Sequence, residues 1–148
     1  MKTHGIFRFT FTLSFLFLFS ANVFSQKVVL NPPEIPAEIT KFVETHFPDT
    51  PIAIATLDND DRNAEYEILL KDRTKLEFDH NFQLEKAESL NALPNSMFPQ
   101  SVLDYVSANY PNSKITEWDI DRNDQEIELD NELELKFDKQ GNFLRLDN

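Results

Sequence analysis

Only one spacing of oxygen-bearing side chains in this sequence follows a known ligand pattern, and it is Asp119-x-Asp121-x-Asn123. Carboxylate and amide groups at these alternate positions open the twelve-residue calcium loop. The pattern then departs from that loop, because Asp124 stands where glycine is needed and Asp130 where the loop ends in glutamate. A second acidic turn contains Asp58, Asp60 and Asp61. We expect solvated turns at both places, and Asp119, Asp121 and Asn123 are retained as weak metal-binding candidates.

Other residue types that support catalysis are scarce. The chain has no cysteine, and its two glycines, Gly5 and Gly141, cannot build a phosphate-binding loop or a nucleophile elbow. His46 falls on the apolar side of an expected helix, and His80 falls in an expected turn. Neither has a nucleophile and an orienting group in view. The sequence therefore predicts a protein that is not an enzyme and that binds no cofactor.

Acidic side chains alternate with apolar ones along several short segments, which places them together on one face of a sheet. The pairs expected to lie opposite one another are Glu65 with Asp79, Glu67 with Glu77, and Glu128 with Glu134. Like charges in such positions destabilise a sheet, and only Lys75 and Lys136 offset them there. One interpretation is a solvated surface that resists aggregation. The other is a partner-binding face for a protein with a basic surface, since complementary charge speeds association.

The first 25 residues have the features of a secretory signal. Lys2 and Arg8 precede an apolar run from Phe9 to Phe19, and a small residue, Ser25, stands at the expected cleavage point. The run is shorter than the roughly 20 apolar residues of a membrane-spanning helix. We predict a signal peptide at 1–25, export to the periplasm or the extracellular space, and no membrane insertion after cleavage.

The charge of the chain excludes some partners. The whole chain has 14 basic and 26 acidic side chains, and loss of Lys2 and Arg8 with the signal leaves 12 against 26, a formal charge of −14. This balance disfavours nucleic acid and anionic membranes, because like charges repel. The identity of the partner and the oligomeric state do not follow from the sequence.

Residues 36–48 and 99–111 follow one pattern, which indicates an internal repeat. Each begins and ends with proline and carries a β-branched residue, an aromatic residue, a valine and a second aromatic residue at matching positions. The apolar positions lie three, four and eight residues after the first one, as on one side of a helix. The prolines fit a helix start and a helix stop.

Each predicted helix is followed by segments of alternating polarity, which is typical of antiparallel strands with one buried face. The expected strands are 52–58, 66–70, 76–78 and 82–87 in repeat one, and 115–121, 127–129, 133–137 and 142–147 in repeat two. The loop around 58–63 is expected to be longer than its counterpart. Parity requires an odd number of turn residues, most simply three, and a three-residue turn places Arg73 and Glu132 in the left-handed region, where glycine is usual.

The helix pattern, together with a strand that ends in Phe-Asp (Phe78-Asp79 and Phe137-Asp138), resembles the PepSY-like, beta-lactamase-inhibitor-like family. Arg73 and Glu132 depart from it by replacing the family's turn glycine. The resemblance implies an α+β fold in which two tandem repeats form a curved antiparallel sheet with both helices on one face. We expect an extended lead-in at 26–34 and a single domain at 35–148, made of repeat one (35–90) and repeat two (91–148).

The implied function is an exported, non-enzymatic protein-binding or inhibitor-like module of the cell envelope. The alternative is a cation-binding envelope protein that uses its aspartate-rich hairpin tips.

Overall fold

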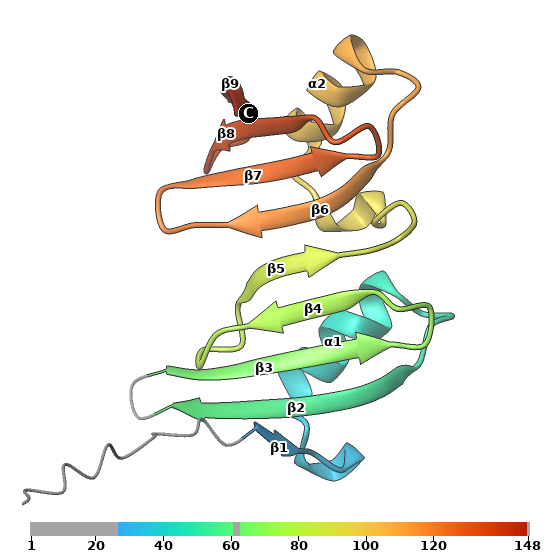
Figure 1. Cartoon of the computed structure of the whole chain (residues 1–148), viewed down its shortest axis with the longest axis vertical. Helices are drawn as coiled ribbons and strands as arrows, with labels where there is room; N and C mark the ends of the chain where they lie inside the picture. Colours follow the sequence, from blue (N-terminus) through green and yellow to red (C-terminus); the bar gives the residue numbers. More distant parts are fainter. Residues whose placement is uncertain (1–26, 61–62, 148) are drawn as a thin grey trace, which may run out of the picture.

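The computed structural model describes residues 27–60 and 63–147 (Figure 1). Over this part of the chain the fold is α+β, with two α-helices, two short 3-10 helices and an open antiparallel sheet of nine strands. The elements are β1 (Lys27–Val29), η1 (Pro32–Glu34), α1 (Ala37–His46), β2 (Ile52–Asp60), β3 (Asn63–Leu70), β4 (Lys75–Phe78), β5 (Leu84–Glu88), η2 (Asn95–Met97), α2 (Gln100–Asn109), β6 (Ile115–Ile120), β7 (Asp124–Leu129), β8 (Glu134–Asp138) and β9 (Phe143–Asp147).

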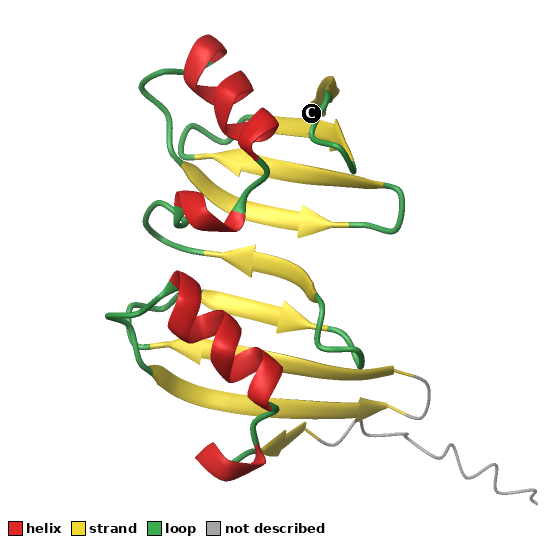
Figure 2. Ribbon diagram, turned by 180° about the vertical axis from the view of Figure 1, so that it is seen from behind, coloured by secondary structure: helices red, strands yellow, loops and turns green. Residues whose placement is uncertain are grey.

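The order of the strands in the sheet is the order of the sequence, from β1 to β9. Helix α1 lies between β1 and β2 in the chain, and α2 lies between β5 and β6. In Figure 2 both helices are in front of the sheet. Strand β5 closes repeat one and pairs with β6, so the two repeats share one continuous sheet.

The two helices begin and end in the same way because their sequences match. Pro36 and Pro99 precede the first turn of α1 and α2, and their fixed backbone suits a helix start. Ile39 and Val102 follow at equivalent positions, and both are fully buried. Each helix therefore attaches to the sheet through one apolar stripe, as the sequence predicts.

One row of side chains crosses the sheet beneath the helices. Leu76, Ala87, Trp118, Ile127 and Leu135 lie opposite one another in register on β4 to β8, and all five are buried. Because side chains alternate along each strand, the residues between them point to the other face.

Aromatic rings join each helix to the buried face of the sheet. The Phe42 ring on α1 meets Phe78 edge-on at 5.3 Å between centroids. The Tyr105 ring on α2 meets Phe137 in the same way at 5.5 Å. The phenylalanine of each Phe-Asp motif is therefore a core residue beneath its helix.

The three-residue turns predicted between β3 and β4 and between β7 and β8 are confirmed. Arg73 has φ of 73° and Glu132 has φ of 65°, both in the left-handed region. The structure adds a second pair that the sequence analysis missed, Phe82 (φ 62°) and Gly141 (φ 81°), in the turns after β4 and β8.

Two expectations about the first repeat need revision. Lys27–Val29 is extended as expected, but it pairs with β2 and forms one edge of the sheet. The prediction of a longer loop around 58–63 is wrong, because Asp58 pairs with Glu65 and Asp60 pairs with Asn63. The extra residues lengthen β2 and β3 and leave only 61–62 between them, where repeat two has three residues between β6 and β7.

Candidate partner-binding face

The face of the sheet opposite the buried row carries most of the acidic side chains of the strands. Its carboxylates lie at positions that alternate with core residues, so the strand period alone places them there. We call the following set the acidic face: Glu67, Glu77, Glu88, Glu117, Asp119, Glu126, Glu128, Glu134 and Asp147.

Two of the three predicted acidic pairs lie opposite each other in the ladder. Glu67 pairs with Glu77, and Glu128 pairs with Glu134. Because β5 pairs with β6, the two acidic pairs lie on one continuous sheet, in two different rows of cross-strand partners.

A continuous row of carboxylates crosses repeat two from β5 to the last strand. In register from one strand to the next it consists of Glu88, Glu117, Glu128, Glu134 and Asp147. Each member therefore has another acid directly beside it. Sequence reasoning missed Glu88 and Glu117, since it did not predict how the two repeats join.

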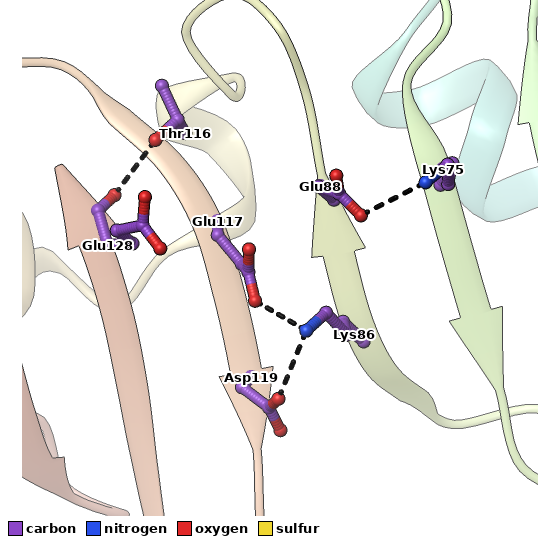
Figure 3. Close-up of polar contacts among 7 residues, drawn as sticks. All are labelled: Lys75, Lys86, Glu88, Thr116, Glu117, Asp119 and Glu128. Atoms are coloured by element: carbon purple, nitrogen blue, oxygen red, sulfur yellow. Dashed lines mark hydrogen bonds and ion pairs between the residues drawn. The ribbon is translucent and has the colours of Figure 1, made fainter. Parts of the chain in front are cut away.

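Lys86 is the main counter-charge near the centre of this face (Figure 3). Its Nζ contacts the carboxylate of Glu117 and lies 3.6 Å from that of Asp119. The hydrogen bond with Glu117 is the largest of the effects that raise the pKa of Lys86. Figure 3 also shows Lys75 on β4, whose Nζ lies 3.3 Å from a carboxylate oxygen of Glu88.

Glu67 pairs with Lys27 and Asp147 with Arg145, whereas Glu77 and Glu128 form no ion pair with a described residue, and their pKa values reflect this. Burial raises the pKa of Glu128, and the charges of Glu117 and Glu134 raise it further. Burial likewise raises the pKa of Glu77, with Glu67 as the next cause. At neutral pH these residues hold negative charges close together, at a cost in folding free energy.

The remaining predicted pair, Glu65 with Asp79, is placed differently. Asp79 follows the end of β4, and its carboxylate accepts hydrogen bonds of 2.8 Å from the backbone N–H groups of Asn81 and Gln83. Burial alone would raise the pKa of Asp79, but the hydrogen bonds from Gln83 and Asn81 lower it overall. Glu65 lies opposite Asp58 on the long hairpin.

Asp138, the aspartate of the second Phe-Asp motif, has the same role in the turn after β8. Its carboxylate accepts 2.9 and 2.8 Å hydrogen bonds from the backbone N–H groups of Gln140 and Asn142. The aspartate of each motif therefore shapes a turn.

The metal-binding candidates are distributed over two environments. Asp119 points to Lys86 on the sheet, whereas Asp121 and Asn123 lie exposed in the hairpin tip after β6. Asp124, at the same tip, is paired with Lys136 at 3.2 Å. Across 27–60 and 63–147, no three His, Asp or Glu side chains are arranged to hold a metal ion.

His46 occupies a structural position at the end of α1. Its Nδ1 lies 2.9 Å from the hydroxyl oxygen of Ser96 in η2, and its ring packs on Phe42 with centroids 4.5 Å apart. Burial lowers the pKa of His46. The contact with Ser96 connects the helix of repeat one to the start of repeat two.

Three solved structures resemble this chain over most of its length. A "putative periplasmic protein" from Bacteroides vulgatus is 31% identical, with a TM-score of 0.76 over 82% of this chain and 97% of its own. A "putative calcium-regulated periplasmic protein" from Bacteroides thetaiotaomicron is 29% identical, with a TM-score of 0.78 over 82% and 97%. A third, a "putative periplasmic protein of unknown function" from Bacteroides vulgatus, is 27% identical, with a TM-score of 0.77 over 83% and 100%.

These likenesses support an exported, periplasmic location. The expected signal at 1–25 lies outside the residues that the structure describes. Within the described ranges no helix has the length and apolar character needed to span a membrane.

The chain has no match among functionally curated proteins. A family model described as "Putative beta-lactamase-inhibitor-like, PepSY-like" matches it twice, at residues 22–86 and 85–145. The two matches meet within β5, the strand at which the repeats join, and the first one reaches back over β1. The chain is a member of the PepSY-like, beta-lactamase-inhibitor-like family and contains two tandem copies of its unit.

Proposed function

We propose that this protein is an exported, non-enzymatic binding module of the cell envelope, and that its acidic face docks a protein with a basic surface. The observation that carries the proposal is the row of directly opposed carboxylates from β5 to β9. A surface needed only for solubility could place its acids apart or opposite lysines, and would avoid the repulsion. Proteins accept such local costs where a site serves function.

The same arrangement suits recognition of a cationic surface. Adjacent carboxylates add their potentials, so a basic patch is attracted before contact and oriented across the strands, along the row. Binding would also offset the repulsion from Glu117 and Glu134, which adds to the effect of burial in raising the pKa of Glu128. The charges that destabilise the free protein would therefore strengthen its binding to a basic partner.

A non-enzymatic role is supported by the chemistry of the described side chains. His46 contacts Ser96, but burial lowers its pKa, and no acidic side chain of the described residues hydrogen-bonds its ring. The described residues thus provide no set of nucleophile, general base and orienting group that could act together.

Photo-crosslinking in cells would identify the partner. A benzoylphenylalanine at Thr56, which lies beside Glu67 on the same face, should capture one protein with a basic surface. The matched probe replaces Thr45, an exposed threonine on α1. Equal capture from both positions, or capture of acidic proteins only, would contradict the proposal.

A second candidate function is calcium binding at the hairpin tip after β6. One similar structure, at 29% identity, is described as calcium-regulated. Asp121, Asn123 and Asp124 line a shallow hollow of about 320 Å³ at this tip, together with Arg122. Oxygen ligands of this kind suit Ca²⁺.

Thermal melting with and without Ca²⁺ separates the two functions. If the tip binds calcium, millimolar Ca²⁺ but not Mg²⁺ raises the melting temperature, and Asp121→Asn removes the effect. A melting temperature that Ca²⁺ leaves unchanged rules this candidate out and leaves the docking proposal intact.

A further inference from the structure

The outer edges of β2 and β6 are equivalent in the two repeats but are covered differently. In repeat two, the segment after β5 continues along β6. The N–H of Ser89 donates to the carbonyl of Thr116 at 2.9 Å, and the N–H of Leu93 donates to that of Ile115 at 2.8 Å. Leu93 is almost fully buried as a result.

In repeat one the chain leaves this edge earlier. The N–H of Leu30 donates to the carbonyl of Ala55 at 2.9 Å, and η1 begins two residues later. The positions equivalent to Ile115 and Thr116 are Ile52 and Ala53. Within 27–60 and 63–147, no outer segment donates a backbone hydrogen bond to either of their carbonyls.

An apolar cavity of about 500 Å³ adjoins this open edge, between η1, α1 and the first residues of β2. Its size is within the range of sites that bind small ligands or side chains, about 300–1,000 Å³. The apolar residues that line it include Val29, Leu30, Ile35, Val43, Phe47 and Ile54. Val29 and Ile54 are 68% and 47% exposed, so apolar surface at this edge of the sheet is open to a partner.

Repeat two also has a hollow beside its helix, of about 610 Å³, but that one does not include the strand edge beyond Ile115. Its lining is more polar, with Asn95, Gln100, Asp104 and Lys114 among its residues. The combination of an apolar cavity with free strand carbonyls is therefore particular to repeat one.

We propose that the groove between α1 and the edge of β2 binds an extended peptide segment of a partner protein, and that this segment carries a bulky aliphatic side chain next to a basic one. The backbone of the segment donates to the carbonyls of Ile52 and Ala53, as Leu93 and Ser89 do in repeat two. Its aliphatic side chain enters the apolar cavity. Addition of a strand in this way uses main-chain hydrogen bonds for affinity and a side-chain pocket for specificity.

The preference for a basic neighbour comes from charge. Glu44 lines the cavity and is exposed on α1, and no Lys, Arg or His of the described chain lines it. The groove also borders the face that carries Glu67, since Val29 and Ile54 lie beside the strand positions of that face. This site does not depend on the acidic face, so either proposal can fail alone.

Nuclear magnetic resonance titration tests the proposal with a defined probe. The ¹⁵N-labelled full chain, as processed by the expression host, is titrated with the peptide acetyl-Lys-Leu-Val-Leu-Lys-amide. We expect saturable shifts at the amides around Ile52–Ile54 and along α1 near Thr40. The peptide with both lysines replaced by glutamate should bind at least fivefold more weakly.

Variants separate the groove from general attraction to a negative protein. Glu44→Lys should weaken binding of the lysine peptide at least fivefold. The matched change Ser107→Lys, at the equivalent exposed position on α2, should leave it within twofold. In repeat two the position equivalent to Thr40 is occupied by Leu103. The variant Thr40→Leu introduces this leucine into repeat one, fills part of the cavity and should weaken binding of both peptides.

The proposal is overturned if the peptide produces no saturable shifts. It is also overturned if shifts map only to the acidic strands, or equally to both helices. A loss of binding in Ser107→Lys as large as in Glu44→Lys would likewise contradict it. Melting curves of each variant confirm that the fold is retained.

Discussion

The turns after β4 and β8 are built on one plan but place very different residues at the same strained position. In both, an aspartate accepts backbone hydrogen bonds and the third residue after it has positive φ. That residue is Phe82 in repeat one and Gly141 in repeat two. The comparison shows that the surroundings of a turn, more than its backbone, decide which residue it holds.

The surroundings differ in what lies over the turn. The ring of Phe82 packs against Tyr66 with centroids 5.5 Å apart, which offsets part of the cost of a left-handed residue. In repeat two, Ser101 of α2 lies over the turn and donates from its hydroxyl to the carbonyl of Gln140 at 3.0 Å. A Cβ at position 141 would lie 2.0 Å from Ser101 Oγ, so any larger residue forces the Ser101 side chain to move, in addition to the strain of its positive φ.

The largest expected effect is that of Gly141→Ala. It combines left-handed strain with overlap on Ser101, and we expect a loss of about 2–3 kcal/mol in a urea melt. Adding Ser101→Gly should restore the part due to overlap. A loss below about 0.5 kcal/mol for the single variant would contradict the account of this turn.

Substitutions of Phe82 should reverse the usual order of alanine and glycine. Phe82→Ala loses the packing on Tyr66 but keeps the strain, at a cost of about 1–2 kcal/mol. Phe82→Gly loses the same packing but relieves the strain, so we expect it to be the more stable variant by about 1 kcal/mol. Equal stability of the two variants would show that the left-handed backbone has little cost here.

The three-residue turns provide a smaller test in both repeats. Arg73→Gly and Glu132→Gly should be neutral or stabilise by up to about 1 kcal/mol, since the relief of a positive φ is partly offset by the greater unfolded-state entropy of glycine. Lys71 lies in the first of these turns but does not have a positive φ, so Lys71→Gly should lower the free energy of unfolding by a few tenths of a kcal/mol. Urea melts of the three variants decide the point, and a cost above about 1 kcal/mol for Arg73→Gly would refute it.

The smallest effect concerns the acidic face. Glu128→Lys should stabilise by about 0.2–1 kcal/mol at pH 7, because it turns the repulsive contacts with Glu117 and Glu134 into attractive ones. The structure shows why Glu77→Lys is a poorer choice. Glu77 lies opposite Glu67 on one side but opposite Lys86 on the other, so a lysine there gains one contact and loses another.

The stability gained by removing the charge of Glu128 should depend on pH in a direction that its pKa shift fixes. The pKa of Glu128 is raised in the folded protein, so its repulsion is present at pH above that raised value and is lost below the ordinary value of 4.5. The advantage of Glu128→Gln in melting temperature should therefore shrink as the pH falls from 7 to 4. A constant advantage across this range would mean that charge is not its cause.

Much of the fold could be predicted from the sequence because its signals are local. The proline-bounded stripe defines α1 and α2, and strand parity places Arg73 and Glu132 at positive φ. The joining of the repeats could not be predicted in this way, because the pairing of β5 with β6 depends on contacts across the sheet.

The candidate site shows the same division. Strand alternation was enough to pair Glu67 with Glu77, within one hairpin. It could not show that Glu88 and Glu117 extend the acidic row, since they come from different repeats. It also could not distinguish Asp79 from the acids of the sheet face, although the Asp79 carboxylate accepts a backbone hydrogen bond from Gln83 in the next turn.

The docking of a basic partner on the acidic face is tested most directly by the association rate of the protein captured from Thr56. The variant Glu128→Lys/Glu134→Lys is compared with Asp49→Lys, which changes charge in the exposed loop between α1 and β2. The account predicts that the double variant associates at least tenfold more slowly at low salt, that high salt largely removes the difference, and that Asp49→Lys stays within twofold of the unchanged protein. Equal rates for the double variant and the unchanged protein at low salt would contradict it and leave the acidic face as a solubility feature.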